Sequence, residues 1–113
     1  MTFPIETLDH ERYMLQALQQ AEAARDLGEV PVGCVLVHEG QVVARGHNLR
    51  QSRQDPTAHA EIIAIKKAAE RLGSWRLLGV AAYVTLEPCA MCAGALINGR
   101  VDTVVYGCGD PKA

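Results

Sequence analysis

Aromatic side chains are scarce in this chain, at 4% of its 113 residues. Hydrophobic residues nevertheless make up 49% of the sequence, so its core must be built mainly from alanine, valine, leucine and isoleucine. The chain is long enough to bury such a core without disulfides. Small aliphatic side chains favour helices packed on a β-branched sheet, so we expect an α/β fold. The length predicts a single domain over residues 1–113.

The sequence also lacks an excess of positive charge, a long apolar run and the residue pattern expected of a secretory leader. The formal net charge is −2, so contacts with nucleic acid would have to come from a local basic patch. No apolar run reaches the roughly 18 residues that suggest a membrane span. The first residues, "MTFPIETLDHERYM", do not have the charged-then-apolar pattern of a signal peptide. We therefore expect a cytoplasmic protein without a membrane partner, in which the cysteines are not paired as disulfides.

Helix and strand signals alternate along the chain. Asp9 is a suitable cap for the first helix, Thr57 for the second, and Pro88 suits the first turn of the third. Glu39-Gly40 predicts a hairpin turn, and residues 47–57 read as a loop. The predicted helices cover residues 9–26, 57–73 and 88–98, and the predicted strands cover residues 32–37, 41–45, 81–87 and 102–107.

This order of elements predicts a mostly parallel sheet covered by helices on both faces, with the hairpin as its antiparallel exception. The chain ends at "GCGDPKA", directly after the last predicted strand. We expect a further strand or helix to follow that point in a complete protein, so the chain reads as truncated at its C-terminus.

Two cysteines, Cys89 and Cys92, lie three residues apart at the start of the last predicted helix. Taken alone, this spacing is compatible with a redox dithiol and with half of a zinc site. Positions i and i+3 share one helical face, and a helix N-terminus stabilises thiolates, so both sulfurs can reach one ion. The sequence has no second pair of this kind, which excludes a four-cysteine zinc ribbon. Cys34 reads as a small core residue within a strand, and Cys108 has no assigned role.

A third ligand is available in "TAHAEI", where His59 and Glu61 lie near the start of the second helix. The two helices should begin beside one crevice at the strand ends, where ligands gather in α/β sheets. His59, Cys89 and Cys92 would then hold one Zn²⁺ with a fourth position open for water. Glu61, two residues from His59, points away from it along the helix. A carboxylate placed beside such a metal but not bound to it is suited to proton transfer.

The words "His59-Ala60-Glu61" and "Pro88-Cys89-Ala90-Met91-Cys92" resemble the signature of the zinc nucleobase deaminases. The sequence is most similar to the bacterial tRNA adenosine deaminases within the cytidine/deoxycytidylate deaminase superfamily. This resemblance spans nearly the whole chain beyond the first helix. It rests on the stretches "EVPVGCVLV", "GHN", "DPTAHAEI", "YVTLEPCAMCAGALI" and "VVYGCGDPKA".

The resemblance implies a cytidine-deaminase-like three-layer αβα sandwich and hydrolysis of the wobble adenosine of an arginine tRNA anticodon to inosine and ammonia. It implies one Zn²⁺ per chain, the tRNA anticodon stem-loop as partner, and a homodimer in which the neighbouring subunit completes each site. His59, Cys89 and Cys92 match the zinc ligands, and Glu61 matches the proton-shuttling glutamate. The resemblance also implies substrate contacts, or a place near the bound RNA, for Asn48, Val30, Pro31, Ala60, Asp110 and Lys112.

The sequence departs from that family in one respect. Members continue past "DPKA" with another strand and with C-terminal helices that help to hold the tRNA. Without them, we expect a four-stranded sheet with an exposed edge and uncovered apolar faces.

Three other functions stay open on the sequence. The chain could deaminate a free base or nucleotide of the cytosine, guanine or dCMP type. It could be a zinc-stabilised binding module whose fourth ligand is Cys108 or His47, or a thiol–disulfide oxidoreductase. Phosphate contacts are the least defined feature, since Lys66, Lys67 and Arg71 also read as the solvated face of a helix. The cations available for such contacts are Arg45, Arg50, Arg53, Lys66, Lys67, Arg71, Arg76 and Lys112.

Overall fold

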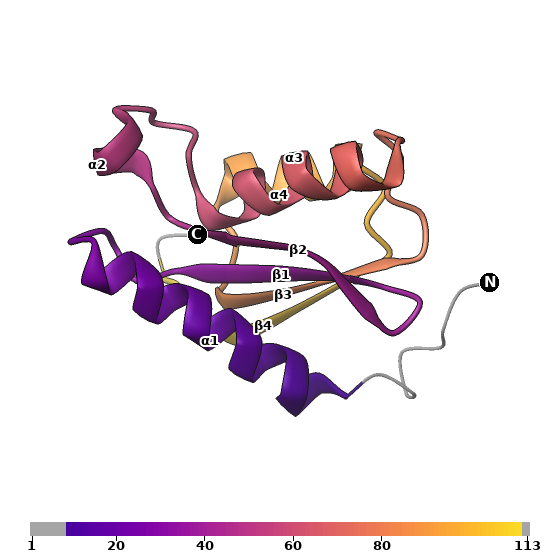
Figure 1. Cartoon of the computed structure of the whole chain (residues 1–113), viewed down its shortest axis with the longest axis horizontal. Coiled ribbons are helices and arrows are strands. Elements are labelled where there is room, and N and C mark those ends of the chain that lie inside the picture. Colours follow the sequence, from indigo (N-terminus) through magenta and orange to yellow (C-terminus); the bar gives the residue numbers. More distant parts are fainter. Residues whose placement is uncertain (1–8, 112–113) are drawn as a thin grey trace.

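The first helix, α1, spans His10–Asp26 in the computed structural model, which describes residues 9–111 (Figure 1). As predicted, Asp9 caps it, and the Asp9 side chain accepts a hydrogen bond from the backbone N–H of Arg12 at 3.0 Å. None of the helices within residues 9–111 is long and apolar enough to cross a lipid bilayer. Lys112, which we expected near bound RNA, lies outside the described residues.

The predicted hairpin follows, with β1 at Gly33–His38 and β2 at Gln41–His47. Glu39 and Gly40 both have positive φ angles, of 51° and 75°. Two such residues in succession form the turn whose twist matches that of the flanking strands. The prediction of the turn is therefore confirmed, and β2 continues two residues beyond the predicted end, to His47.

The segment after β2 differs from the prediction. Part of the expected loop forms a short helix, α2, at Arg50–Arg53, which is too short to show an apolar period. The next helix, α3, spans Ala60–Leu72 and begins later than predicted. Thr57 is not its cap, because the Thr57 hydroxyl donates to Asp55 within the loop at 2.7 Å. His59 takes the N-cap position instead.

The last elements are β3 at Val80–Leu86, α4 at Ala90–Asn98 and β4 at Thr103–Cys108. The sheet has the order β2-β1-β3-β4. The pairs β1–β2 and β1–β3 are antiparallel, and β3–β4 is parallel. The sheet is mixed, as expected, and β2, β3 and β4 run in one direction. A mostly parallel pairing is wrong, because the first strand of the hairpin lies between β2 and β3.

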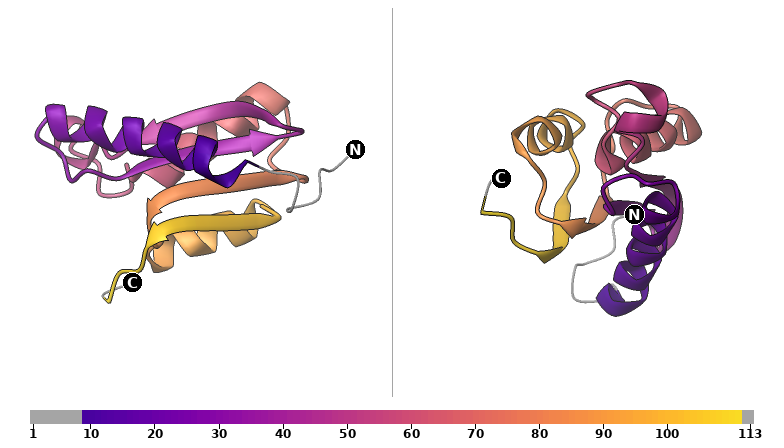
Figure 2. Two further views of the ribbon diagram at one scale, coloured as in Figure 1. Left: turned by 90° about the horizontal axis from the view of Figure 1, so that it is seen from below. Right: turned by 90° about the vertical axis from the view of Figure 1, so that its left-hand side faces the viewer.

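Helices cover both faces of this sheet, which confirms the three-layer αβα arrangement. In Figures 1 and 2, α3 and α4 lie on one face and α1 lies on the other. The core has two parts, separated by the sheet. The part under α1 is built on Tyr13, Ala17, Val35, Val37, Ala81 and Tyr83. The larger part, under α3 and α4, includes Cys34, Leu36, Ala60, Ala64, Val84 and Leu96, so Cys34 is the core residue that the sequence predicted.

The two outer strands of the sheet differ in how they meet solvent. At β2, Lys67 Nζ donates to the carbonyl of Arg45 at 3.1 Å, and Arg71 donates to that of Val43 at 3.5 Å. Four residues along a helix and two along a strand both advance by about 6–7 Å, so successive turns of α3 reach alternate carbonyls of β2. Lys67 and Arg71 are exposed, as the predicted solvated helix face requires, and in addition they donate to the edge of the sheet.

The outer strand at the other end, β4, is the exposed edge that we expected. Its side chains Val104 and Tyr106 are 38% and 48% exposed. Together with Leu96 and Ile97 of α4 they line an apolar hollow beside the strand.

Two glycines in the hairpin allow the helices to approach the sheet closely. A Cβ at Gly33 would overlap the backbone of α1 at Ala17, and one at Gly46 would overlap the carbonyl oxygen of Ala60 and approach the Ala64 nitrogen to 2.9 Å. Ala60 lies between His59 and Glu61 in sequence. Gly46 therefore fixes how closely the first turn of α3 sits on the sheet.

We predict that Gly46→Ala destabilises the protein by about 1–3 kcal/mol, the usual cost of overpacking, because backbone atoms cannot move aside cheaply. Urea unfolding followed by circular dichroism would measure this change. Gly94→Ala is the matched control. Gly94 lies within α4 with no atom near its added methyl group, so that variant should be neutral or more stable by about 0.5–1 kcal/mol. Equal destabilisation of both variants would contradict the assigned role of Gly46.

Candidate metal centre and adjoining pocket

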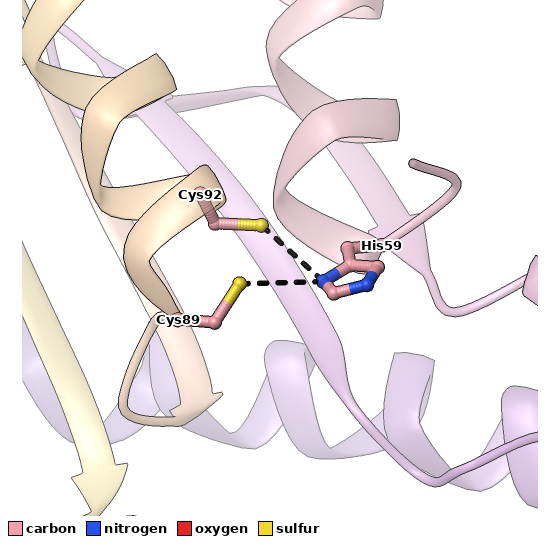
Figure 3. A group of neighbouring side chains, drawn as sticks. All are labelled: His59, Cys89 and Cys92. Atoms are coloured by element: carbon pink, nitrogen blue, oxygen red, sulfur yellow. Dashed lines mark hydrogen bonds between the residues drawn. The ribbon is translucent and has the colours of Figure 1, made fainter. Parts of the chain in front are cut away.

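Two helix N-termini meet at the edge of the sheet where β2 and β3 end. His59 is the N-cap residue of α3 and Cys89 is the N-cap residue of α4. Neither side chain forms a capping hydrogen bond to its own helix. Both are directed instead toward a shared point, where Cys92 joins them from the first turn of α4 (Figure 3).

The separations within this cluster suit a single metal ion. His59 Nδ1 lies 3.6 Å from Cys89 Sγ and 3.5 Å from Cys92 Sγ, and the donor atoms of the three residues all lie within 4.8 Å of one another. Nitrogen and sulfur ligands of a tetrahedral zinc ion are separated by roughly 3.5 Å, given the usual bond lengths. The predicted ligands are thus together in a geometry that fits a metal.

The environment of Cys92 also favours a cation. Burial raises the pKa of the Cys92 thiol strongly, and the neighbouring Glu61 and Cys89 raise it further. A bound metal ion supplies the missing positive charge and displaces the thiol proton. With the His59 imidazole beside both sulfurs, the cluster is arranged as a metal site.

The two residues considered as a fourth protein ligand lie elsewhere. Cys108 is exposed at the end of β4, and His47 Nδ1 is hydrogen-bonded to Gln20 Oε1 at 3.0 Å. Among residues 9–111, the cluster consists of His59, Cys89 and Cys92. A site with three protein ligands leaves one tetrahedral position for a small molecule, as catalytic sites do.

Glu61 lies beside the cluster without belonging to it. Its side chain is only 3% exposed and lines the same pocket as His59 and Cys89. Burial raises the pKa of the Glu61 carboxyl above its ordinary value, which brings its protonated form closer to neutral pH. A carboxyl group of this kind is suited to accepting and returning a proton.

The pocket next to the cluster has a volume of about 200 Å³. That is smaller than the cavities of about 300–1,000 Å³ that take drug-sized ligands, so it fits a single ring system better than a large molecule. Four of the predicted substrate residues line it: Val30, Asn48, Ala60 and Asp110. Pro31 is exposed and is not among the described residues that line the pocket. Arg50, one of the cations considered for phosphate contacts, also lines it, together with Val32, Leu86 and Glu87, which the sequence did not indicate.

Backbone contacts orient two of the lining side chains. Asn48 is 5% exposed, and its Oδ1 accepts a hydrogen bond from the backbone N–H of Arg50 at 3.1 Å. Glu87 Oε1 accepts from the backbone N–H of Asp110 at 3.0 Å, which attaches the loop after β4 to the segment that leads to Cys89. Glu87 directly precedes the Pro88-Cys89 motif, so its position in the sequence could have indicated that it lies at the pocket.

Sequence reasoning missed one buried acid. Glu29 is 5% exposed, and it is bonded to Gln51 and Ser52 of α2. Its hydrogen bonds, above all those from Ser52, hold the pKa of the Glu29 carboxyl below its ordinary value, so it stays ionised at neutral pH. Nothing in the sequence around "GEVPVG" identifies that partner, because it lies more than twenty residues away in a segment without periodicity.

Comparison with known proteins places this arrangement in a family. The sequence matches the family model of the MafB19-like deaminases over residues 8–113. It is 53% identical over 102 residues to the tRNA-specific adenosine deaminase of Bacillus subtilis, and the match covers 90% of this chain and 63% of that protein. The chain thus spans less than two thirds of the length of that relative.

Two solved structures are similar to the fold. One comes from a study of A-to-I editing by tRNA:A34 deaminases at the wobble position of transfer RNA. It has a TM-score of 0.90 and 47% identity, and covers 93% of this chain and 81% of that chain. The other is guanine deaminase from Bacillus subtilis, with a TM-score of 0.87, 37% identity, and coverage of 90% and 66%.

We predict that Cys89→Ser and Cys92→Ser each lower the bound metal from about one ion per chain to nearly none. The protein would be loaded with zinc or cobalt(II), and metal content would be measured after gel filtration. Cobalt(II) would in addition show a sulfur-to-metal absorption band that both variants lose. Cys108→Ser is the matched control and should keep the metal and the band. Metal loss from the Cys108 variant, or retention in both others, would contradict the assignment.

Proposed function

Because the chain belongs to the MafB19-like deaminase family, we propose that it catalyses hydrolytic deamination of adenosine to inosine at the wobble position of a tRNA anticodon, releasing ammonia. The observation that carries this proposal is the placement of the buried Glu61 carboxyl in one small pocket with His59 and Cys89. The identity of 53% to the tRNA-specific adenosine deaminase of Bacillus subtilis supports the choice of substrate.

The proposed metal is zinc, one ion per chain, held by His59, Cys89 and Cys92. Two thiolates and one imidazole are a typical zinc donor set, and it is one of the two sets found in zinc nucleobase deaminases. When bound there, zinc supplies an acidified water that can be deprotonated near neutral pH. The positive ends of α3 and α4 stabilise the negative charge of the two thiolates.

Glu61 performs the proton transfers in this proposal. It accepts a proton from the water that attacks C6 of the adenine and delivers it to the ring nitrogen next to C6. It then assists protonation of the exocyclic amine, which leaves as ammonia. Adenosine and water are thereby converted to inosine and ammonia, with no other reactant. A carboxyl group held dry and close to the base suits both the accepting and the donating step.

The remaining lining residues are proposed to hold the base. Asn48 is oriented by its bond to Arg50 and faces the pocket with Val30 and Ala60. Asp110 lines the pocket from the segment after β4. The proposal also includes the anticodon stem-loop as the RNA partner, and a homodimer in the cytoplasm as the working form of this single deaminase domain.

A second candidate function is deamination of a free base or nucleotide, such as guanine, cytosine or dCMP. The similarity to guanine deaminase from Bacillus subtilis, at 37% identity, is the observation in its favour. Zinc-loaded protein would be incubated with an anticodon stem-loop and, separately, with each small substrate. Inosine in the RNA is the expected product. Ammonia from a small substrate, with the RNA left unchanged, would favour the second candidate.

We predict that Glu61→Gln lowers the rate of adenosine deamination by about 10²–10⁴-fold, the usual contribution of a positioned acid–base group. Its zinc content should stay at the wild-type level, because Glu61 is not a ligand. Inosine formation in single-turnover assays and metal analysis would measure the two quantities. Glu70→Gln, an exposed change on the same helix, should alter neither. Near-normal turnover by the Glu61 variant would show that another group moves the protons.

A further inference from the structure

Glu29 is a buried acid that the proposed chemistry does not use. It lies in the segment between α1 and β1, next to the pocket residue Val30. Its carboxylate accepts three hydrogen bonds: Oε1 from the backbone N–H of Gln51 at 3.1 Å, and Oε2 from the backbone N–H and the hydroxyl of Ser52, both at 2.6 Å. A carboxylate so fully bonded and so little exposed has a specific structural task.

These bonds join two neighbouring segments that both line the pocket. On the side of Glu29, Val30 and Val32 line the pocket; on the side of α2, Asn48 and Arg50 line it. One backbone bond, from the Asn48 N–H to the Val32 carbonyl at 3.2 Å, also crosses between them. Glu29 adds three more bonds at the outer end of the same pair of segments. The two segments are therefore held together at two places along their length.

The position of α2 depends strongly on this contact. A helix of only four residues is far too short to be stable by itself. Its N-cap residue, Leu49, provides no side-chain hydrogen bond. Glu29 accepts from the N–H groups of Gln51 and Ser52, which have no partner within the helix. An acid from another part of the chain thus joins the backbone bonds of Asn48 and Leu49 in holding α2, and with it Arg50, in place.

We propose that Glu29 is a positioning residue that holds Asn48 and Arg50 in place and thereby determines which base the pocket accepts. This inference rests on the proposed deamination of a base in the pocket described above. With its segment held in place, Asn48 meets a purine ring in a single orientation. If α2 is held less firmly, Asn48 can shift. Adenine then loses its fixed contacts, and the smaller cytosine is no longer excluded.

Glu29→Gln is the most informative change because it keeps the size of the side chain. An amide has one acceptor oxygen and one donor nitrogen, while the donors that face Glu29 occupy both of its oxygens. The amide nitrogen would oppose an N–H or O–H group of Gln51 or Ser52. Ser52→Ala removes one bond to Glu29 and leaves the two backbone bonds, so its effect should be smaller and in the same direction.

Asp102→Asn is the matched control. The Asp102 carboxylate also accepts from a backbone N–H, that of Gly79 at 3.1 Å, but it lies at the end of the sheet opposite to the metal cluster, where β3 begins. Its substitution should cost stability without changing the pocket. Thermal unfolding would compare the stabilities of Glu29→Gln and Asp102→Asn.

The test compares adenosine and cytidine at the wobble position of one anticodon stem-loop. We expect Glu29→Gln to lower kcat/KM for adenosine by about tenfold or more, the scale of a lost hydrogen bond to a charged group, mainly through KM. The preference for adenosine over cytidine should fall as well. Asp102→Asn should leave both quantities at the wild-type level. If Glu29→Gln is merely less stable and keeps the wild-type KM and preference, the proposal is overturned.

Two further measurements keep this inference separate from the proposed function. Amide hydrogen exchange should become faster at residues 48–53 in Glu29→Gln and stay unchanged in α1. If the wild-type protein deaminates no RNA, the proposed function fails, and binding of free adenine and guanine to the zinc-loaded proteins takes the place of the kinetic test. Weaker binding to Glu29→Gln than to Asp102→Asn would support the role of Glu29, and equal binding would refute it.

Discussion

The candidate site depends on one constraint, the meeting of two helix N-termini at a single edge of the sheet. His59 and Cys89 hold the N-cap positions of α3 and α4, yet neither side chain caps its helix. Both helices leave their first N–H groups and positive dipole ends near the donor atoms. The close approach that Gly46 permits sets the height of α3 above the sheet, and that height decides whether an imidazole from one helix reaches two sulfurs from the other.

The direction of β1 completes the site. Because β1 is antiparallel to both β2 and β3, it begins at the edge where they end. The segment that enters β1 therefore lies between the two helix starts and supplies Val30 and Val32 to the pocket. In a sheet with β1 reversed, this segment would lie at the far end. The mixed pairing is thus what brings a third stretch of chain to the metal cluster.

The sequence predicted the parts of this site that depend on local spacing. The i and i+3 positions of Cys89 and Cys92, and the motif around His59, are sufficient to indicate a metal site. The strand order, the start of α3 and the existence of α2 were beyond it, because they are determined by contacts between distant segments. Glu29 illustrates the reason: its role comes from α2, which has no apolar period and is held by that same acid.

The two edges of the sheet differ in how readily a further strand can pair with them. Side chains of α3 occupy outward carbonyls of β2, where an incoming strand would have to bind. Within residues 9–111, β4 is the outer strand whose side chains remain exposed beside an apolar hollow. The β4 edge is consequently the more accessible one for an added strand, from the same molecule or another. By binding carbonyls of β2, Lys67 and Arg71 of α3 make that edge of the sheet less accessible than the β4 edge.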